Sequence, residues 1–290
     1  MNAHQQIVDA LPYREQPLVL QTASSAYLRV ASLPEARNCR PLTVPYSKIE
    51  RVQSASTLHN VLIYIAAVLG ATKKTLIEID SARDYGQRYT ASAFTPQGWS
   101  AVVLQERWSA YEACRTYYEP IQKSLARTEG NIEVVDAGTI SDMQQLNSLL
   151  STAEGVGVVD VMTMFAGGGR DVSLFSKMLS CVARPRVIAL FYQAYWGTLD
   201  RSRVGAGVED EHGRERYFTG ASLSALVRIG TTVRYRLVWC VPSMAVAIFV
   251  DENEGQGLRT ISARSCIGRS KEWKRDAEAM WDEAQAYEWT

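Results

Sequence analysis

The chain places a carboxylate and a tight turn directly after a short apolar segment. Residues 75–79 (TLIEI) predict a buried strand that carries Glu78, and Asp80 and Ser81 follow at once. In folds that bind nucleotide cofactors, the backbone passes close to the ligand at such a turn, and glycine suits it because glycine lacks a Cβ. Here the first glycine is Gly86. The pattern predicts a nucleotide-type pocket with altered chemistry at this turn.

The chain contains other residues that could suggest metal, phosphate or nucleophilic chemistry. The aspartates at 80, 84, 136 and 160 belong to different predicted elements and form no dense ligand run, so we expect no metal site. The glycines at 167–169 lack the Lys-Ser/Thr of a phosphate-binding loop and favour a permissive turn. No Gly-x-Ser-x-Gly motif or Cys-His pairing is present. The sequence therefore predicts no metal and no covalent nucleophile.

The histidines and one aromatic segment offer candidate substrate contacts. His59 lies in a predicted helix and favours a packing role, whereas His212 lies in a charged segment that is either a surface loop or a substrate-side loop. Ligands in open α/β sheets bind beyond the carboxyl ends of the strands. The residues after the predicted strand 185–191 are therefore either substrate contacts or ordinary aromatic packing: Tyr192, Gln193, Tyr195 and Trp196.

Strand-like and helix-like segments alternate after residue 54. Short apolar segments rich in Val and Ile predict strands at 75–79, 100–105, 131–136, 157–164 and 185–191. Helical spacing predicts helices at 54–69, which ends at Gly70, and near 87–96, 107–127, 141–152 and 171–182. Nearly all-apolar strands are typical of a parallel sheet with helices on both faces. The pattern predicts an α/β fold.

The last part of the chain breaks this alternation. Residues 220–230 predict a helix, and residues 233–240 and 245–250 predict two strands that a short link at Pro242-Ser243 makes antiparallel neighbours. Strand alternation would place Tyr235, Leu237 and Trp239 on one face and Arg234, Arg236 and Val238 on the other. A mostly parallel seven-stranded sheet with an antiparallel last strand resembles the Rossmann-like fold of class I S-adenosylmethionine (SAM)-dependent methyltransferases.

Several segments sharpen this resemblance. The segment TASAFTPQGWSAVVLQERWSAYEACR is similar to the second-strand region of FkbM-type methyltransferases, and VVDVMTMFAGGGRDVSLFSKML resembles their fourth-strand region. RPRVIALFYQAYWG is similar to their fifth strand, and the most specific match is the closing region, YFTGASLSALVRIGTTVRYRLVWCVPSMAVAIFVDENE. The resemblance covers roughly residues 54–255. It implies a methyltransferase-like domain of the FkbM type.

The resemblance implies a SAM pocket formed by Glu78, Asp80, Ser81, Tyr85, Gln105, Glu106 and Phe165. Three of these positions depart from the family pattern. Asp80 stands where the family has Gly, Gln105 where it has a ribose-binding acid, and Phe165 where it has Asp. An amide accepts a hydrogen bond but lacks the charge of a carboxylate. The implied pocket is present with diluted SAM-binding chemistry.

Composition sets the wider expectations. Lys+Arg 31 equals Asp+Glu 31, which argues against a general nucleic-acid binder, and the longest apolar run is far shorter than the ~20 residues of a membrane span. No signal peptide is evident, and the five scattered cysteines predict reduced, buried thiols in a cytoplasmic protein. Residues 1–53 predict a proline-rich cap or extension, and residues 256–290 a charged helical tail.

Three functions remain open on the sequence. The first is an active methyltransferase that modifies an O or N atom of a small-molecule biosynthetic intermediate. The second is a lapsed methyltransferase that serves as a binding or partner subunit, with another protein or a second copy as its partner. The third is an enzyme that uses the same pocket for another ligand. Methyl transfer needs no covalent nucleophile, so the sparse set of reactive groups is compatible with the first.

Overall fold

A computed structural model describes most of the predicted domain. The described residues are 55–71, 73–79, 90–106, 108–124, 130–152, 158–166, 169–193, 202–203, 220–241, 244–255 and 258–267. The predicted cap (residues 1–53) and the predicted tail helix beyond residue 267 lie outside these ranges. The three-part division of the chain stays a prediction.

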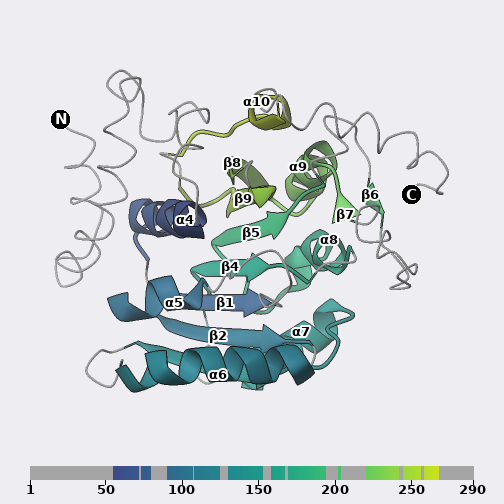
Figure 1. Ribbon diagram of the computed structural model, residues 1–290. Coiled ribbons are helices and arrows are strands. Elements are labelled where there is room, and N and C mark those ends of the chain that lie inside the picture. Colours follow the sequence, from purple (N-terminus) through teal and green to yellow (C-terminus); the bar gives the residue numbers. More distant parts are fainter. Residues whose placement is uncertain are drawn as a thin grey trace, which may run out of the picture.

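The described residues form one mixed sheet of seven strands (Figure 1). Its spatial order is β3 (Asn131–Asp136), β2 (Ser100–Gln105), β1 (Thr75–Ile79), β4 (Val161–Met164), β5 (Val187–Phe191), β9 (Val246–Asp251) and β8 (Tyr235–Val241). The pairs from β3 to β5 are parallel, whereas β9 is antiparallel to both β5 and β8. This is the strand order of the class I methyltransferase fold, and the predicted fold class is confirmed.

Helices cover both faces of the sheet: α4 (Ala55–Leu69), α5 (Ala91–Phe94), α6 (Trp108–Ser124), α7 (Met143–Thr152), α8 (Arg170–Ser176), α9 (Leu223–Thr232) and α10 (Ala263–Ile267). Glu78 of β1 bonds to α5 and α6. The next residue back, Ile77, points to the opposite face. Phe249 of β9 lies in register with Ile77 across β4 and β5, so it points to that same face, where it contacts Phe175 of α8. The α5–α6 pair and α8 therefore lie on opposite faces.

The predicted element bounds hold closely for the first three strands and shift elsewhere. β4 and β5 begin later than predicted, at Val161 and Val187, directly after Asp160 and Arg186, whose side chains form an ion pair. A short two-stranded sheet, β6 (Ser202–Arg203) with β7 (Gly220–Ala221), was not predicted. Among the described helices, none is long and apolar enough to cross a membrane.

The ion pair of Asp160 and Arg186 joins the elements at the amino ends of β4 and β5. The two side chains lie 2.9 Å apart and are only 2% and 11% exposed. Arg186 also donates to the carbonyls of Leu69 and Gly70, which end α4, and pairs with Glu254 after β9. Burial alone would lower the pKa of Arg186, but its bonds to Glu254 and Asp160 raise it. The guanidinium therefore stays charged.

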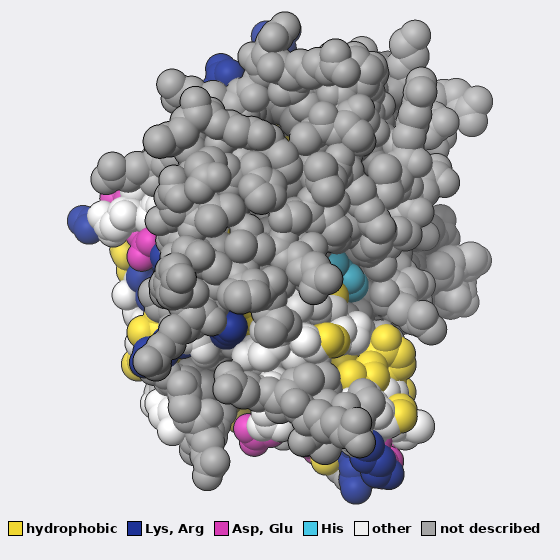
Figure 2. Space-filling view, turned by 90° about the vertical axis from the view of Figure 1, so that its left-hand side faces the viewer, with side chains coloured by type: hydrophobic (Ala, Val, Ile, Leu, Met, Phe, Trp, Pro, Cys, Tyr) yellow, Lys and Arg dark blue, Asp and Glu magenta, His cyan; other side chains and the backbone are white. Residues whose placement is uncertain are grey.

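Figure 2 views the molecule from the side on which the parallel strands begin. Basic and acidic side chains occur together on this face, and apolar side chains gather at its lower right beside Lys and Arg. The described surface in this view thus carries charges of both signs.

The prediction for the faces of β8 was wrong for one residue. Tyr235 pairs with Asp251 and Leu237 with Phe249, but the register then shifts, and Trp239 pairs with Ile248. Val238 is the extra residue of a bulge, and a bulge moves the following side chain to the other face of the strand. Trp239 therefore shares a face with Ile248, opposite Leu237. Both faces are buried, so the apolar pattern could not reveal the shift.

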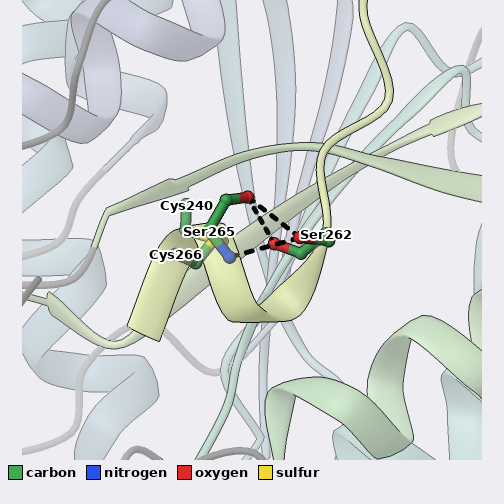
Figure 3. The surroundings of a disulfide bond; sticks show 4 residues. All are labelled: Cys240, Ser262, Ser265 and Cys266. Atoms are coloured by element: carbon green, nitrogen blue, oxygen red, sulfur yellow. Dashed lines mark hydrogen bonds between the residues drawn. A yellow bond between two sulfur atoms is a disulfide. The ribbon is translucent and has the colours of Figure 1, made fainter. Parts of the chain in front are cut away.

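The prediction of reduced cysteines was wrong for two of them. Cys240 of β8 and Cys266 of α10 form a disulfide, with Cα atoms 6.2 Å apart (Figure 3). Cys114 and Cys181 are free and buried. The segment before α10 also contacts β8, because the Ile261 amide donates to the Leu237 carbonyl. No sequence pattern indicated this bond, since the two cysteines are 26 residues apart and meet only through the packing of α10.

Replacing Arg186 with Met should destabilise the fold. The change leaves the Asp160 carboxylate buried without its ion-pair partner, which costs about 3 kcal/mol. Urea unfolding of the two proteins measures the loss. The control is Lys123→Met, which breaks an exposed ion pair with Glu119 and should cost no more than about 0.5 kcal/mol. Equal effects of the two changes would contradict the role given to Arg186.

Reduction of the Cys240–Cys266 bond should lower the melting temperature. A crosslink over 26 residues removes about 3 kcal/mol of unfolded-state entropy on the loop-closure account. Thermal melting with and without dithiothreitol measures the effect. The control is the Cys240→Ala, Cys266→Ala double variant, whose melting temperature should not respond to the reductant. A wild-type protein that ignores the reductant would show that the bond contributes nothing.

Candidate functional site

The candidate site lies where β1, β2, β3 and β4 end at their carboxyl edge. In this strand order, β1 and β4 are neighbours whose following chains leave in opposite directions. Such a switch point leaves a crevice in open α/β sheets. Gln105 ends β2, and Glu106 follows it. Asp136 ends β3, and Phe165 follows β4. The structure thus brings three predicted site residues, Gln105, Glu106 and Phe165, to one edge.

Glu106 is the buried acid of this edge. Its side chain is 1% exposed, and its Oε1 accepts a hydrogen bond of 3.1 Å from the Ile140 amide in the chain after β3. Its Oε2 lies 2.5 Å from Nη2 of Arg170 at the start of α8. The bridge runs from the end of β2 to the chain after β4, and β1 lies between these strands. A buried carboxylate is stable here because it is paired and hydrogen-bonded.

Gln105 and Asp136 stand side by side at the ends of β2 and β3. They are register partners in the parallel pair. The Gln105 side chain is buried, whereas Asp136 is exposed and accepts a bond of 3.3 Å from the Gly138 amide. With Glu106, the next residue along the chain, they place three acceptor side chains at the ends of β2 and β3. Hydroxyl groups of a ribose are donors that such acceptors can bind.

Glu78 faces the helices rather than the strand ends. Its Oε2 accepts a bond of 2.8 Å from the Ala91 amide at the start of α5, and its Oε1 lies 3.3 Å from the Tyr118 hydroxyl of α6. Burial, followed by the nearby Glu78 charge, raises the pKa of Tyr118 far above its usual value. Tyr118 therefore stays a protonated donor. Glu78 therefore holds the start of α5 against β1. Its predicted contact with the cofactor stays a prediction.

Phe165 gives the edge an apolar wall. It is 2% exposed, its ring lies 4.4 Å from the ring of Phe191, and its amide donates to the Ile79 carbonyl. The aromatic pair covers the ends of β4 and β5. Gly169, which starts α8, has φ 78°, a left-handed conformation that glycine adopts without strain. This geometry agrees with the permissive turn expected for the glycine run.

The predicted substrate side is only partly described. Tyr192 is buried, and its amide donates to the Ala245 carbonyl; the Gln193 amide donates to the Ala221 carbonyl at 2.7 Å. Both follow β5, away from the β2 end that holds Gln105 and Glu106. The remaining predicted site residues lie outside the described ranges: Asp80, Ser81, Tyr85, Tyr195, Trp196 and His212. Within those ranges, no three His, Cys, Asp or Glu side chains gather to hold a metal ion.

Arg170 is the residue that sequence reasoning missed. It also donates to the Ala166 carbonyl at 2.7 Å. A signal did exist: the first turn of a helix favours acidic side chains, so a basic residue directly after a glycine run is unusual there. The spatial reason, its pairing with Glu106, depends on the sheet order and could not be read from spacing alone.

Comparison with known proteins adds a distant likeness of fold. No sequence model of a protein family matches the chain, and no curated protein sequence matches it significantly. The SAH-bound methyltransferase PaMTH1 of Podospora anserina shares 13% identity, covering 81% of this chain and 87% of its own, with a TM-score of 0.39. The METTL16 methyltransferase domain shares 12% identity, covering 81% of this chain and 80% of its own, with a TM-score of 0.41. The plantazolicin methyltransferase BpumL in complex with SAH shares 12% identity, covering 93% of this chain and 95% of its own, with a TM-score of 0.38. Such values indicate no ligand or reaction for this chain, and the fold assignment rests on its strand order.

His59 should make the fold sensitive to mild acid. Burial lowers the pKa of His59 from 6.5 to about 4, so the folded state holds this side chain neutral while the unfolded state protonates it below about pH 6.5. Stability is thus retained near pH 7 and falls by about 2 kcal/mol on going to pH 5. Urea unfolding at both pH values tests this. In His59→Leu the pH-dependent loss should be smaller by that amount; an unchanged loss would contradict it.

Proposed function

We propose that this chain is a divergent methyltransferase-like protein that binds SAM at the carboxyl edge of its sheet and methylates an O or N atom of a small molecule. The observation that carries the proposal is the acceptor group at the ends of β2 and β3, within a sheet of the class I methyltransferase order. The motif resemblance to FkbM-type methyltransferases supports the same pocket. A cytoplasmic location belongs to this proposal.

The residues present fit a nucleoside that carries an amino-acid part. Gln105 and Glu106 supply acceptors where ribose hydroxyls would bond, and Asp136 lies next to them at the exposed rim. Ile140, whose amide bonds to Glu106, and Phe165, which follows β4, are buried apolar residues at this edge. When bound, SAM supplies an activated methyl group, so the protein has to position the acceptor and exclude water. The predicted substrate contacts Tyr192, Gln193, Tyr195, Trp196 and His212 belong to this proposal as well.

A lapsed methyltransferase is the second candidate, and the structure offers two observations in its favour. The Glu106 carboxylate is already paired with Arg170 and is 1% exposed. Phe165, at a position where the FkbM pattern has Asp, is packed on Phe191. A chain of this kind would keep the fold as a binding or partner subunit, with another protein or a second copy as its partner.

Calorimetric titration with SAM and with S-adenosylhomocysteine (SAH) separates the two candidates. A working site should bind at micromolar concentration, about −8 kcal/mol, and a lapsed site should give no heat at millimolar ligand. In a working site, Gln105→Ala should weaken binding by about 1 kcal/mol, the usual contribution of a neutral hydrogen bond. The control is Gln122→Ala on the exposed side of α6, which should leave affinity unchanged.

The residue at position 80 gives a further comparison within the same experiment. The resemblance places a glycine there, and Asp80 would crowd and repel the carboxylate of the ligand. If wild type fails to bind and the double change Asp80→Gly, Phe165→Asp restores binding, the chain is a lapsed methyltransferase. Absence of binding by wild type and by the double variant would reject the SAM pocket altogether.

A further inference from the structure

Arg170 has hydrogen-bond donors that none of the described residues uses. Its Nη2 contacts both the Ala166 carbonyl and the Glu106 carboxylate. Its Nε and Nη1 contact no acceptor among the described residues and are not buried, and the side chain is 26% exposed. A guanidinium presents its donors in a rigid planar fork that matches a carboxylate. One side of this fork is anchored, and the other meets no acceptor of the described residues.

The position of Arg170 decides which part of a ligand it can meet. The side chain leaves the chain after β4 and reaches the acid after β2, and β1 is the strand between them. Its guanidinium therefore lies near the end of β1, at the switch point where the ligand crosses an open α/β sheet. With the ribose at the β2 end, the other end of the ligand lies toward β1 and β4, on the side of Arg170.

We propose that Arg170 binds the carboxylate of the amino-acid part of the ligand, with Glu106 and the Ala166 carbonyl holding its guanidinium in place. The inference rests on the proposed function. It gives the pocket a positive group, which would offset the negative charge that Asp80 adds to the sequence directly after β1. It also assigns Glu106 a positioning role toward Arg170 in addition to its place at the ribose end.

Two ligands that differ in the amino-acid part test the proposal by calorimetry on the full chain. SAH contains adenosine and an amino-acid part, whereas 5′-methylthioadenosine keeps the adenosine and lacks the carboxylate. Arg170→Gln should weaken SAH binding about 10-fold or more, the usual loss for a hydrogen bond to a charged group. Its affinity for methylthioadenosine should stay within about 2-fold. Lys177→Gln, which removes an exposed charge at the other end of α8, should change neither affinity.

A second variant and a second measurement cover the case in which Arg170→Gln disturbs the fold. Arg170→Lys keeps a positive charge beside Glu106 but loses the planar fork, so it should weaken SAH binding less than Arg170→Gln and leave methylthioadenosine binding unchanged. In wild type, added salt should weaken SAH binding more than methylthioadenosine binding, because only SAH carries a carboxylate for Arg170.

The outcomes separate this inference from the proposed function. Equal weakening of both ligands by Arg170→Gln, or a wild type that binds methylthioadenosine but not SAH, would overturn the role of Arg170 and leave the nucleoside pocket intact. A wild type that binds neither ligand would overturn the proposed function and this inference with it. Selective loss of SAH binding supports both.

Discussion

The buried ion pair of Asp160 and Arg186 is the constraint on which the amino edge of the sheet depends. Removing each charge from water costs several kcal/mol, and only an ion-pair partner together with further hydrogen bonds offsets this cost. The Asp160 carboxylate meets this demand with Arg186 and with the amides of Lys73 and Lys74. Arg186 meets it with the carbonyls that end α4 and with Glu254. One pair thus fixes the relative positions of α4, the start of β1, β4, β5 and the chain after β9.

The two ends of the sheet use arginines differently. At the amino edge, Arg184 lies over the ring of Tyr235 and pairs with Asp251, and Arg236 donates to the carbonyls of Glu254, Gly255 and Leu258. These arginine side chains bind other parts of the protein. At the carboxyl edge, only Nη2 of Arg170 contacts acceptors of the described residues. A fixed amino edge leaves the carboxyl edge available for the ligand site that the proposed function requires.

The sequence predicted the sheet well because parallel strands covered on both faces have a simple signature. Each is a short, nearly all-apolar segment, and the closing hairpin shows in residues 233–250. Local patterns cannot report which side chains meet after folding. The Glu106–Arg170 pair, the bulge at Val238 and the Cys240–Cys266 bond all depend on contacts between distant segments. Glu78 illustrates the same limit: the strand pattern predicts its burial but not its bonds to the Ala91 amide and the Tyr118 hydroxyl.

The segment that carries Cys266 has a consequence for the outer margin of the sheet. β8 is an edge strand, and an uncovered edge offers free amides and carbonyls to a strand of another molecule. Residues 258–266 run along this strand. The Ile261 amide donates to the Leu237 carbonyl, the Arg236 side chain donates to the Leu258 carbonyl, and a disulfide links Cys266 at the end of the segment to Cys240. At the opposite margin, β3 is protected by exposed polar side chains, among them Glu133 and Asp136. The crosslink therefore helps to hold in place the segment that covers the β8 edge, the margin where a strand of another molecule would otherwise pair.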